Sequence, residues 1–372
     1  MTVNKWKVAA LIASGLVLLQ ISSATADNAV SSLSVDQIVQ LSQKNNIDDK
    51  LTDLNQELAK LTPAYTPNPQ IPGGGMGGSW TNTYYLTIAP MLSAAQQKAS
   101  DYSTLNTKLQ RELNYYNAAY TYWLLEKSAA VSQNNLNLAT QERDITQKKL
   151  DSGLASENDL LQSEVSLNTA TTGYQQAQLA LQMQQYQLNQ SIGDVLVQPL
   201  DVSDIQMVYL TPDQLNADAT VQDMQTNHQS LAPTKALLNA YQNALSTVAK
   251  QTDLNIPVSG LTNYYQQEVT AAQMQLQKQQ QVLEFLSRSY IDRLNNAAAA
   301  IKLDQDSVTK TQQVYDNSTK LYEVGLITYS DLEKIRLNLL NVNLALYSAE
   351  KNYLSLSQEF RLFKEGLMPA QG

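Results

Sequence analysis

The chain has 372 residues, of which 43% are hydrophobic and 16% charged, enough for one large core or for two domains. Its formal net charge of −9, without any basic run, argues against nucleic-acid binding, because phosphate contacts need a basic face. One histidine, His228, and no cysteine supply too few ligands for most transition-metal sites.

Residues 1–26 carry the features of an export signal. Lys5 and Lys7 precede an apolar run over residues 8–21, and residues 24–26 form a cleavage site of the A-x-A type. The apolar run is short for a spanning helix, and no later stretch approaches the roughly 20 apolar residues that such a helix needs. The sequence therefore predicts an exported chain without helical membrane spans.

The next predicted element is a helix from Ser34 to about residue 60. Ser34 and Gln37 are spaced as a capping box, and apolar residues follow at helical spacing: Ile38, Leu41, Ile47, Leu51, Leu54, Leu58 and Leu61. Prolines over residues 63–72 then exclude helix, and the glycines over residues 73–78 indicate a flexible linker. These glycines lack the Lys-Ser/Thr pair that would mark a phosphate-binding loop.

Residues 80–89 are predicted as the best strand of the chain. Trp80, Tyr84, Leu86 and Ile88 would share one face, with threonines on the other. A strand of this length is just long enough to cross a bilayer at a tilt. The aromatic face suits either a membrane interface or the edge of a small soluble sheet, and the sequence leaves both open.

Two long helical hairpins make up most of the remaining chain. Residues 92–150 and 263–322 contain no Pro or Gly, so each stretch is predicted as one very long helix. Each helix ends at a Gly-Leu turn, near residues 151–157 and 323–329, and a Ser/Thr-x-x-Asp cap then starts a return helix. The return helices carry apolar residues every seven positions: Leu160, Leu167, Tyr174, Leu181 and Leu188, then Leu332, Leu339, Leu346, Tyr353 and Phe360.

This duplication divides the mature chain into two structural repeats, residues 27–200 and 201–372. The second repeat has only a weak counterpart to the strand of the first. Apolar residues alternate over residues 252–261, but Pro257 and Gly260 make that segment short and poor as a strand. The β-strand region is therefore expected to be small.

The arrangement resembles the TolC-like outer-membrane efflux protein family. The resemblance rests on the two Gly-Leu turns with their following aspartates, on the heptads, and on Ala170, Tyr174 and Ala177 in one return helix and Ala345 and Ala349 in the other. It covers nearly the whole mature chain. It implies a mainly α fold, in which two tandem long antiparallel helical hairpins form a trimeric α-barrel with a small or degenerate strand region.

The resemblance also implies a place in the cell and partners. Family members are homotrimers whose helical tube lies in the periplasm and opens into a β-barrel in the outer membrane. Their helical tips contact a periplasmic adaptor protein and an inner-membrane pump. The expected location here is the cell outer membrane with a periplasmic helical domain, or the periplasm alone if the membrane part is missing.

The same resemblance assigns roles to individual residues. It implies an adaptor-docking tip of Gly153, Leu154, Gly325 and Leu326, a periplasmic aperture of Asp159, Tyr322, Asp331 and Lys334, and a membrane strand with Trp80, Tyr84, Leu86 and Ile88. Two positions depart from the family pattern. Ile327 stands where an arginine would help to hold the tip, and Lys334 stands where a second acid would lie, so Asp331 and Lys334 could be salt-bridged. Both aspartates also suit a purely structural role at a helix N-terminus.

The sequence thus predicts a passive duct for efflux or type I secretion that docks to an adaptor and a pump. The alternative is a periplasmic or secreted coiled-coil scaffold that has lost the membrane barrel and transport. An enzyme is not expected, because no acid, base or nucleophile motif is present. No cofactor is expected either.

Overall fold

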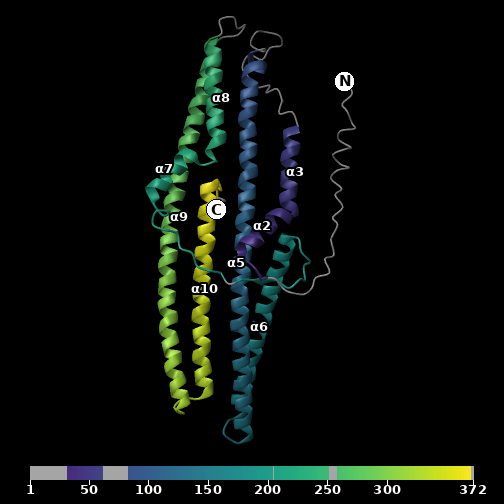
Figure 1. The fold of residues 1–372 in the computed structure, drawn as a ribbon, viewed down its shortest axis with the longest axis vertical. Helices are drawn as coiled ribbons and strands as arrows, with labels where there is room; N and C mark the ends of the chain where they lie inside the picture. Colours follow the sequence, from purple (N-terminus) through teal and green to yellow (C-terminus); the bar gives the residue numbers. More distant parts are fainter. Residues whose placement is uncertain (1–31, 62–82, 204, 251–257, 370–372) are drawn as a thin grey trace.

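The structure, a computed structural model, describes residues 32–61, 83–203, 205–250 and 258–369. It is a long, narrow helical bundle in which two hairpins lie side by side (Figure 1). The elements run in the order β1 (Ser32–Leu33), α2 (Val35–Asn45), α3 (Ile47–Leu61), η1 (Tyr84–Ile88), α5 (Ala89–Asp151), α6 (Glu157–Ile192), β2 (Asp201–Val202), α7 (Ala217–Asn227), α8 (Leu231–Ala249), α9 (Val258–Glu323) and α10 (Tyr329–Glu365). The predicted mainly α fold with tandem long hairpins is confirmed.

The lower half of the bundle is a single layer of four helices. α6 packs on α5, α5 on α10, and α10 on α9, so α6 and α9 form the two outer edges (Figure 1). In the upper half α8 packs between α5 and α9, and α3 lies on the free flank of α5. Within the described residues, no helix combines the length and apolarity needed to cross a bilayer.

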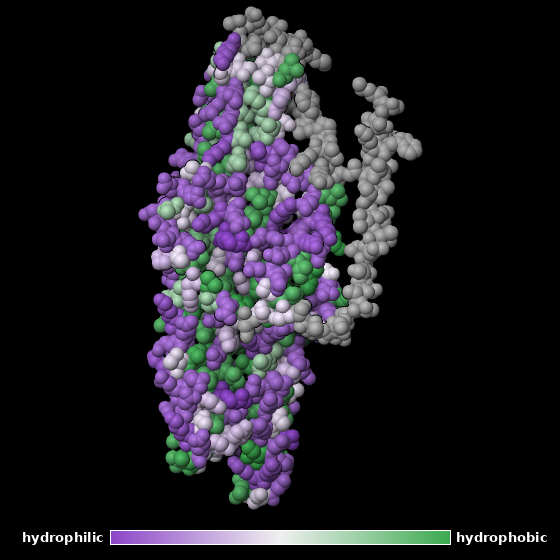
Figure 2. Space-filling view, viewed as in Figure 1, coloured by the Kyte–Doolittle hydropathy of each residue, from purple (hydrophilic) through white to green (hydrophobic). Residues whose placement is uncertain are grey.

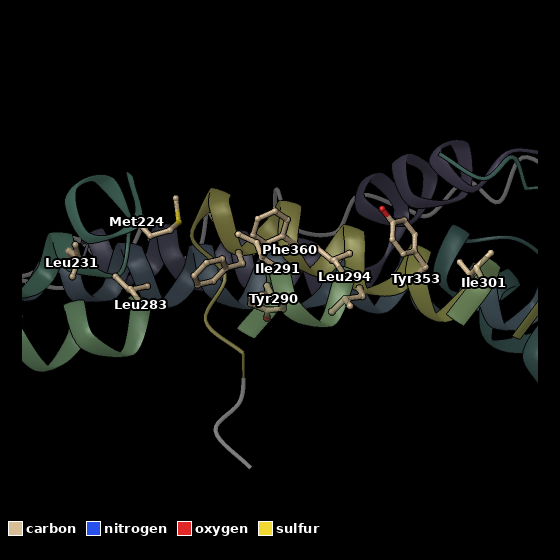
Figure 3. Packing of buried hydrophobic residues seen from close by; sticks show 11 residues of the cluster. Met224, Leu231, Leu283, Tyr290, Ile291, Leu294, Ile301, Tyr353 and Phe360 are labelled. Atoms are coloured by element: carbon tan, nitrogen blue, oxygen red, sulfur yellow. The ribbon is translucent and has the colours of Figure 1, made fainter. Parts of the chain in front are cut away.

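The largest buried cluster joins the second hairpin to the short helices α7 and α8. Tyr290, Ile291, Leu294 and Ile301 of α9 face Tyr353, Phe360 and Phe363 of α10, and Met224 and Leu231 close the cluster at one end (Figure 3). The Tyr353 and Phe360 positions belong to the predicted heptad of the return helix, which confirms that this stripe faces the partner helix.

The predicted first helix is in fact two helices, α2 and α3. Ser34 and Gln37 form the expected capping box at the start of α2. Asn46 then adopts an extended conformation and ends α2, while its side chain accepts a hydrogen bond of 2.8 Å from the Asp48 N–H at the start of α3. The side chain of an asparagine competes for backbone groups in this way, which favours a break.

The strand prediction is wrong for the part of residues 80–89 that the structure describes. Tyr84, Leu86 and Ile88 lie in the π-helix η1, which leads directly into α5, whereas Trp80 lies outside the described residues. Tyr84 and Ile88 are one helical turn apart and pack on Leu261 and other residues of α8 and α9, while Leu86 is 79% exposed. Helical spacing therefore overrides the alternation, since it lets this segment join a buried cluster.

The weak second strand is also not formed where the structure describes it. α9 begins at Val258, so the end of the 252–261 segment is helical, and residues 251–257 lie outside the described residues. The described strands are β1 and β2, which pair in parallel with Leu33 opposite Val202. This pair attaches the start of the described chain to the segment that follows α6.

Candidate functional site

Both predicted tip turns are formed, and they lie at the same end of the bundle (Figure 1). Gly153 and Gly325 have φ of 70° and 77°, the left-handed conformation that an L side chain adopts only with strain. The N–H of Leu154 donates to the Lys149 carbonyl at 2.7 Å, and the N–H of Leu326 donates to the Leu321 carbonyl at 2.8 Å. Both turns are therefore Schellman motifs, and the glycines are needed for their backbone angle.

The two leucines of these turns are strongly exposed. Leu154 is 79% and Leu326 72% exposed, and Val324 beside the second turn is 69% exposed. In Figure 2 the hydrophobic colour lies at both lower ends of a face that is otherwise mostly hydrophilic. In a Schellman motif, an apolar residue directly after the glycine commonly packs on the last turn of its own helix. These leucines point into solvent instead, which leaves an apolar contact surface at the tip.

Asp159 and Asp331 cap the return helices. Asp159 accepts hydrogen bonds from the N–H of Ser156 at 2.8 Å and from its hydroxyl at 2.7 Å, and Asp331 accepts the same pair from Thr328 at 3.1 and 2.7 Å. These bonds lower the pKa of both carboxyl groups, the backbone bond contributing most at Asp159 and the side-chain bond at Asp331. The predicted capping role is formed at both turns.

Lys334 pairs with a residue of the first hairpin, where the sequence suggested Asp331. Its Nζ lies 2.8 Å from Glu142 Oε1, and this bond raises the pKa of the Lys334 ammonium. Ser330 donates to the same carboxylate oxygen at 2.9 Å. Glu142 of α5 thus holds the start of α10 from two sides, close to the tip.

A second polar link between the hairpins lies further from the tip, about two turns along α5. Arg336 donates to Glu333 through two nitrogens, at 2.7 and 2.9 Å, and its third nitrogen donates to Asn134 of α5 at 3.0 Å. The spacing of Glu333 and Arg336 could have predicted their pairing. Asn134 and Glu142 carry no local sequence feature that would identify them as partners, because they lie half a chain away.

Tyr322 lies at the second turn. Its ring and that of Tyr329 pack across the turn with centroids 5.9 Å apart, and both side chains are partly exposed. The tip and aperture residues are therefore gathered at one end of the bundle. Of the residues predicted as a membrane strand, Tyr84, Leu86 and Ile88 lie at the opposite end, in η1 (Figure 1).

His228 has a structural role between α7 and α8. Its ring lies 2.7 Å from the Ser230 hydroxyl through Nδ1 and 2.9 Å from the Phe363 carbonyl through Nε2. Burial lowers the pKa of the ring, and the neutral form satisfies both contacts. This histidine therefore fixes the α7–α8 connection on α10.

No protein-family model matches the sequence, and no curated protein matches it. Solved structures do match, over nearly their whole length. The CmeC outer membrane channel of Campylobacter jejuni is 14% identical, with 91% of this chain and 87% of that chain covered at a TM-score of 0.64. The outer membrane protein VceC of Vibrio cholerae is 12% identical, with 90% and 97% covered at a TM-score of 0.63.

A third match is the open state of the MtrE outer membrane channel of Neisseria gonorrhoeae. It is 13% identical, with 91% of each chain covered at a TM-score of 0.56. The identities are low, so the similarity lies in the path of the backbone and not in shared side chains. The chain has the fold of these outer membrane channels.

Proposed function

We propose that copies of this chain join edge to edge into a helical tube that serves as a passive export duct. The observation that carries this proposal is the distribution of exposed apolar residues over the four-helix layer. The inner helices α5 and α10 each have a single large exposed apolar residue, Ile145 and Tyr329, near the tip. The edge helices carry several, and apart from Tyr322 at the second turn these fall on one stripe of each helix.

The stripe of α6 consists of Leu161, Val165, Leu179 and Met183, and the stripe of α9 consists of Met274, Phe285, Leu303, Val314 and Leu321. At about 100° per residue, the members of each stripe lie within about 40° of one another around the helix. Between the two ends of the α6 stripe, a groove of about 510 Å³ runs past Gly173. Each edge thus offers a narrow apolar strip of the kind that packs against another helix.

The two edges differ, so a contact between α6 of one copy and α9 of the next is heterologous. Heterologous contacts close into rings when the rotation per copy permits it. Three copies are proposed, because the family that the tip turns resemble is trimeric and the matched channels share this fold. A ring of such layers would enclose a channel lined by helices.

The exposed leucines of the two turns support the second part of the proposal, which is docking. Leu154 and Leu326 would form an apolar surface on each copy at the periplasmic end, and a periplasmic adaptor protein with an inner-membrane pump would bind there. Leu154→Asp with Leu326→Asp should leave assembly intact and stop export. Loss of assembly in that variant would instead show that the leucines contribute to the contacts between copies of the chain.

The duct itself is tested by fractionation and conductance. The exported chain should remain in the outer-membrane fraction after a carbonate wash, and the purified protein should conduct ions across a planar bilayer. Recovery only in the soluble fraction would refute both the proposed duct and the proposed outer-membrane location.

The alternative is a periplasmic scaffold without transport, and the helical conformation of Tyr84–Ile88 is the observation that favours it. A scaffold would form the ring and give no conductance.

A further inference from the structure

The connection between β2 and α7 crosses the layer and carries backbone groups without partners (Figure 1). The N–H of Ser203 donates to the Leu33 carbonyl at 3.1 Å, and the N–H of Leu210 donates to the Tyr353 hydroxyl at 2.9 Å. Between these two anchors, the backbone of residues 206–209 makes no hydrogen bond to any residue that the structure describes. Backbone groups of this kind bond to water or to another chain.

The side chains of this connection alternate as in a β-strand. Ile205 and Met207 are partly buried and pack on the cluster that joins α2, α5 and α10. Gln206 and Val208 point away from it, and Val208 is 69% exposed. Because alternate side chains lie on opposite faces of an extended segment, its N–H and C=O groups point along the surface of the layer. The connection therefore offers an unpaired strand edge, to which a strand of another chain can add.

A cavity of about 760 Å³ lies beside this edge. Its wall on α10 runs from Leu354 to Glu365, that is, from the Tyr353 anchor toward the C-terminal end of the helix. Neighbouring strands lie about 4.8 Å apart, and one turn of a helix rises about 5.4 Å. A strand added on this side would therefore lie over the next turn of α10. The buried side chains of Leu354 and Phe360 line the cavity there and provide an apolar surface.

The charged side chains around the cavity leave one cation without a carboxylate. Arg361 donates to Glu365 at 2.7 Å and to Glu112 of α5 at 2.6 Å. Asp36 accepts a hydrogen bond from a tyrosine of α5. Lys364 lies against the ring of a nearby phenylalanine and has no carboxylate partner among the described residues. A carboxylate brought in by another molecule can pair with this ammonium group.

The cavity lies away from the edges of the layer. Its lining residues belong to α2, α5, α10 and the connection, and none belongs to α6 or α9. The contacts between copies proposed above use α6 and α9, so they do not cover it. Binding at this cavity therefore does not depend on the proposed ring or on transport.

We propose that residues 206–209 bind an extended segment of a partner protein by β-strand addition. The partner strand supplies the missing main-chain hydrogen bonds, places alternate apolar side chains in the cavity and presents an acidic residue to Lys364. Main-chain bonds give such complexes their affinity, and pockets for alternate side chains give their specificity. The partner is thus a protein with an extended segment that is apolar at alternate positions and carries an acid between them.

Synthetic peptides test this site on the full exported chain. The panel consists of acetylated hexapeptide amides with Val, Ile or Phe at alternate positions and Thr, Glu or Lys at the others. Fluorescence polarisation should show saturable binding, and peptides with Glu should bind more tightly than those with Lys. N-methylation of alternate amides removes the hydrogen bonds and keeps the side chains, so it should weaken binding about tenfold or more. Failure of the whole panel to bind would overturn the site.

Variants of the chain separate strand addition from simple apolar adhesion. Val208→Pro removes one N–H of the edge and should abolish binding, whereas Val208→Thr keeps that N–H and the branched shape and should bind nearly as well as the unchanged chain. Lys364→Glu should reverse the preference, so that peptides with Lys bind more tightly. Equal binding of N-methylated peptides, or equal losses in both Val208 variants, would overturn strand addition. An unchanged preference in Lys364→Glu would overturn the acidic character of the partner.

Discussion

Replacing Arg111 by methionine should release α3 from the bundle while the long hairpins stay folded. Methionine keeps much of the side-chain length and removes the donors to Asp49 and Thr52. The side chains of Arg111 and Asp49 are only 26% and 12% exposed, so this pair is less screened by water than the surface pairs. Hydrogen bonds to charged groups contribute about 1.5–3 kcal/mol each when the group left behind stays buried.

At about 1.4 kcal/mol per factor of ten, the loss of one such bond raises the opening equilibrium of α3 about 10- to 100-fold. Hydrogen exchange followed by mass spectrometry measures this directly, because local openings set the exchange of each segment. Amides of Ile47–Leu61 should exchange faster by that factor, while amides in the middle of α5 and α9 should not change.

Arg288→Met is the matched control for that experiment. Arg288 binds two carboxylates, those of Asp218 and Glu284, but all three side chains are at least 44% exposed. Exposed ion pairs of this kind contribute about 0–1 kcal/mol to the stability of the folded state. Unchanged exchange of α3 in Arg111→Met, or equal acceleration in both variants, would refute the claim that buried charge holds this helix.

Three further predictions concern the tip. Gly153→Ala should destabilise the turn after α5 by about 1–2 kcal/mol, because φ is +70° there. Gly260→Ala adds a methyl group in open space within a helix and should be neutral or slightly stabilising. Hydrogen exchange at the turn after α5 should accelerate only in the first variant. The pKa of Asp159 is depressed, so its cap stabilises fully above the unfolded carboxyl pKa of about 3.9 and is lost as pH falls through the lower folded value. The protection factor at the start of α6, which corrects for the slower intrinsic exchange in acid, should therefore fall as the pH is lowered, and Asp159→Asn should flatten that dependence. Lys334→Met breaks the ion pair with Glu142, with a loss of stability of no more than about 1 kcal/mol. The distribution of distances between spin labels on the two turns should broaden. An unchanged distribution would show that this ion pair does not hold the two turns together.

The features that the sequence predicted correctly are those set by neighbouring residues. A left-handed glycine that ends a helix and a capping box between residues three apart both depend on neighbouring residues alone. The roles of Gly153, Ser156 and Asp159 could therefore be predicted without tertiary information. The heptads of α6 and α10 were readable as well, because they repeat over many turns.

The features that the sequence missed depend on packing between distant segments. Tyr84, Leu86 and Ile88 fit both a strand and a helix, and only the buried cluster around Leu261 and Tyr265 selects the helix. The partner of Lys334 depends on the register of one hairpin against the other, which no local spacing encodes. In the same way, the apolar spacing of α3 predicted a helix, but its charged attachment became visible only once Arg111 was placed beside it.

The parallel pair of β1 and β2 sets an order for folding. Leu33 stands near the start of the described chain, and its partner Val202 follows the entire first hairpin. Contacts between residues so far apart in sequence form late, because the chain between them must first be ordered. During synthesis, which proceeds from the N-terminus, α2 can pack on α5 and α6 as they appear, but β1 has no strand partner until Val202 has been made. β1, α2 and the first hairpin can then close together with β2 before the second hairpin has been made.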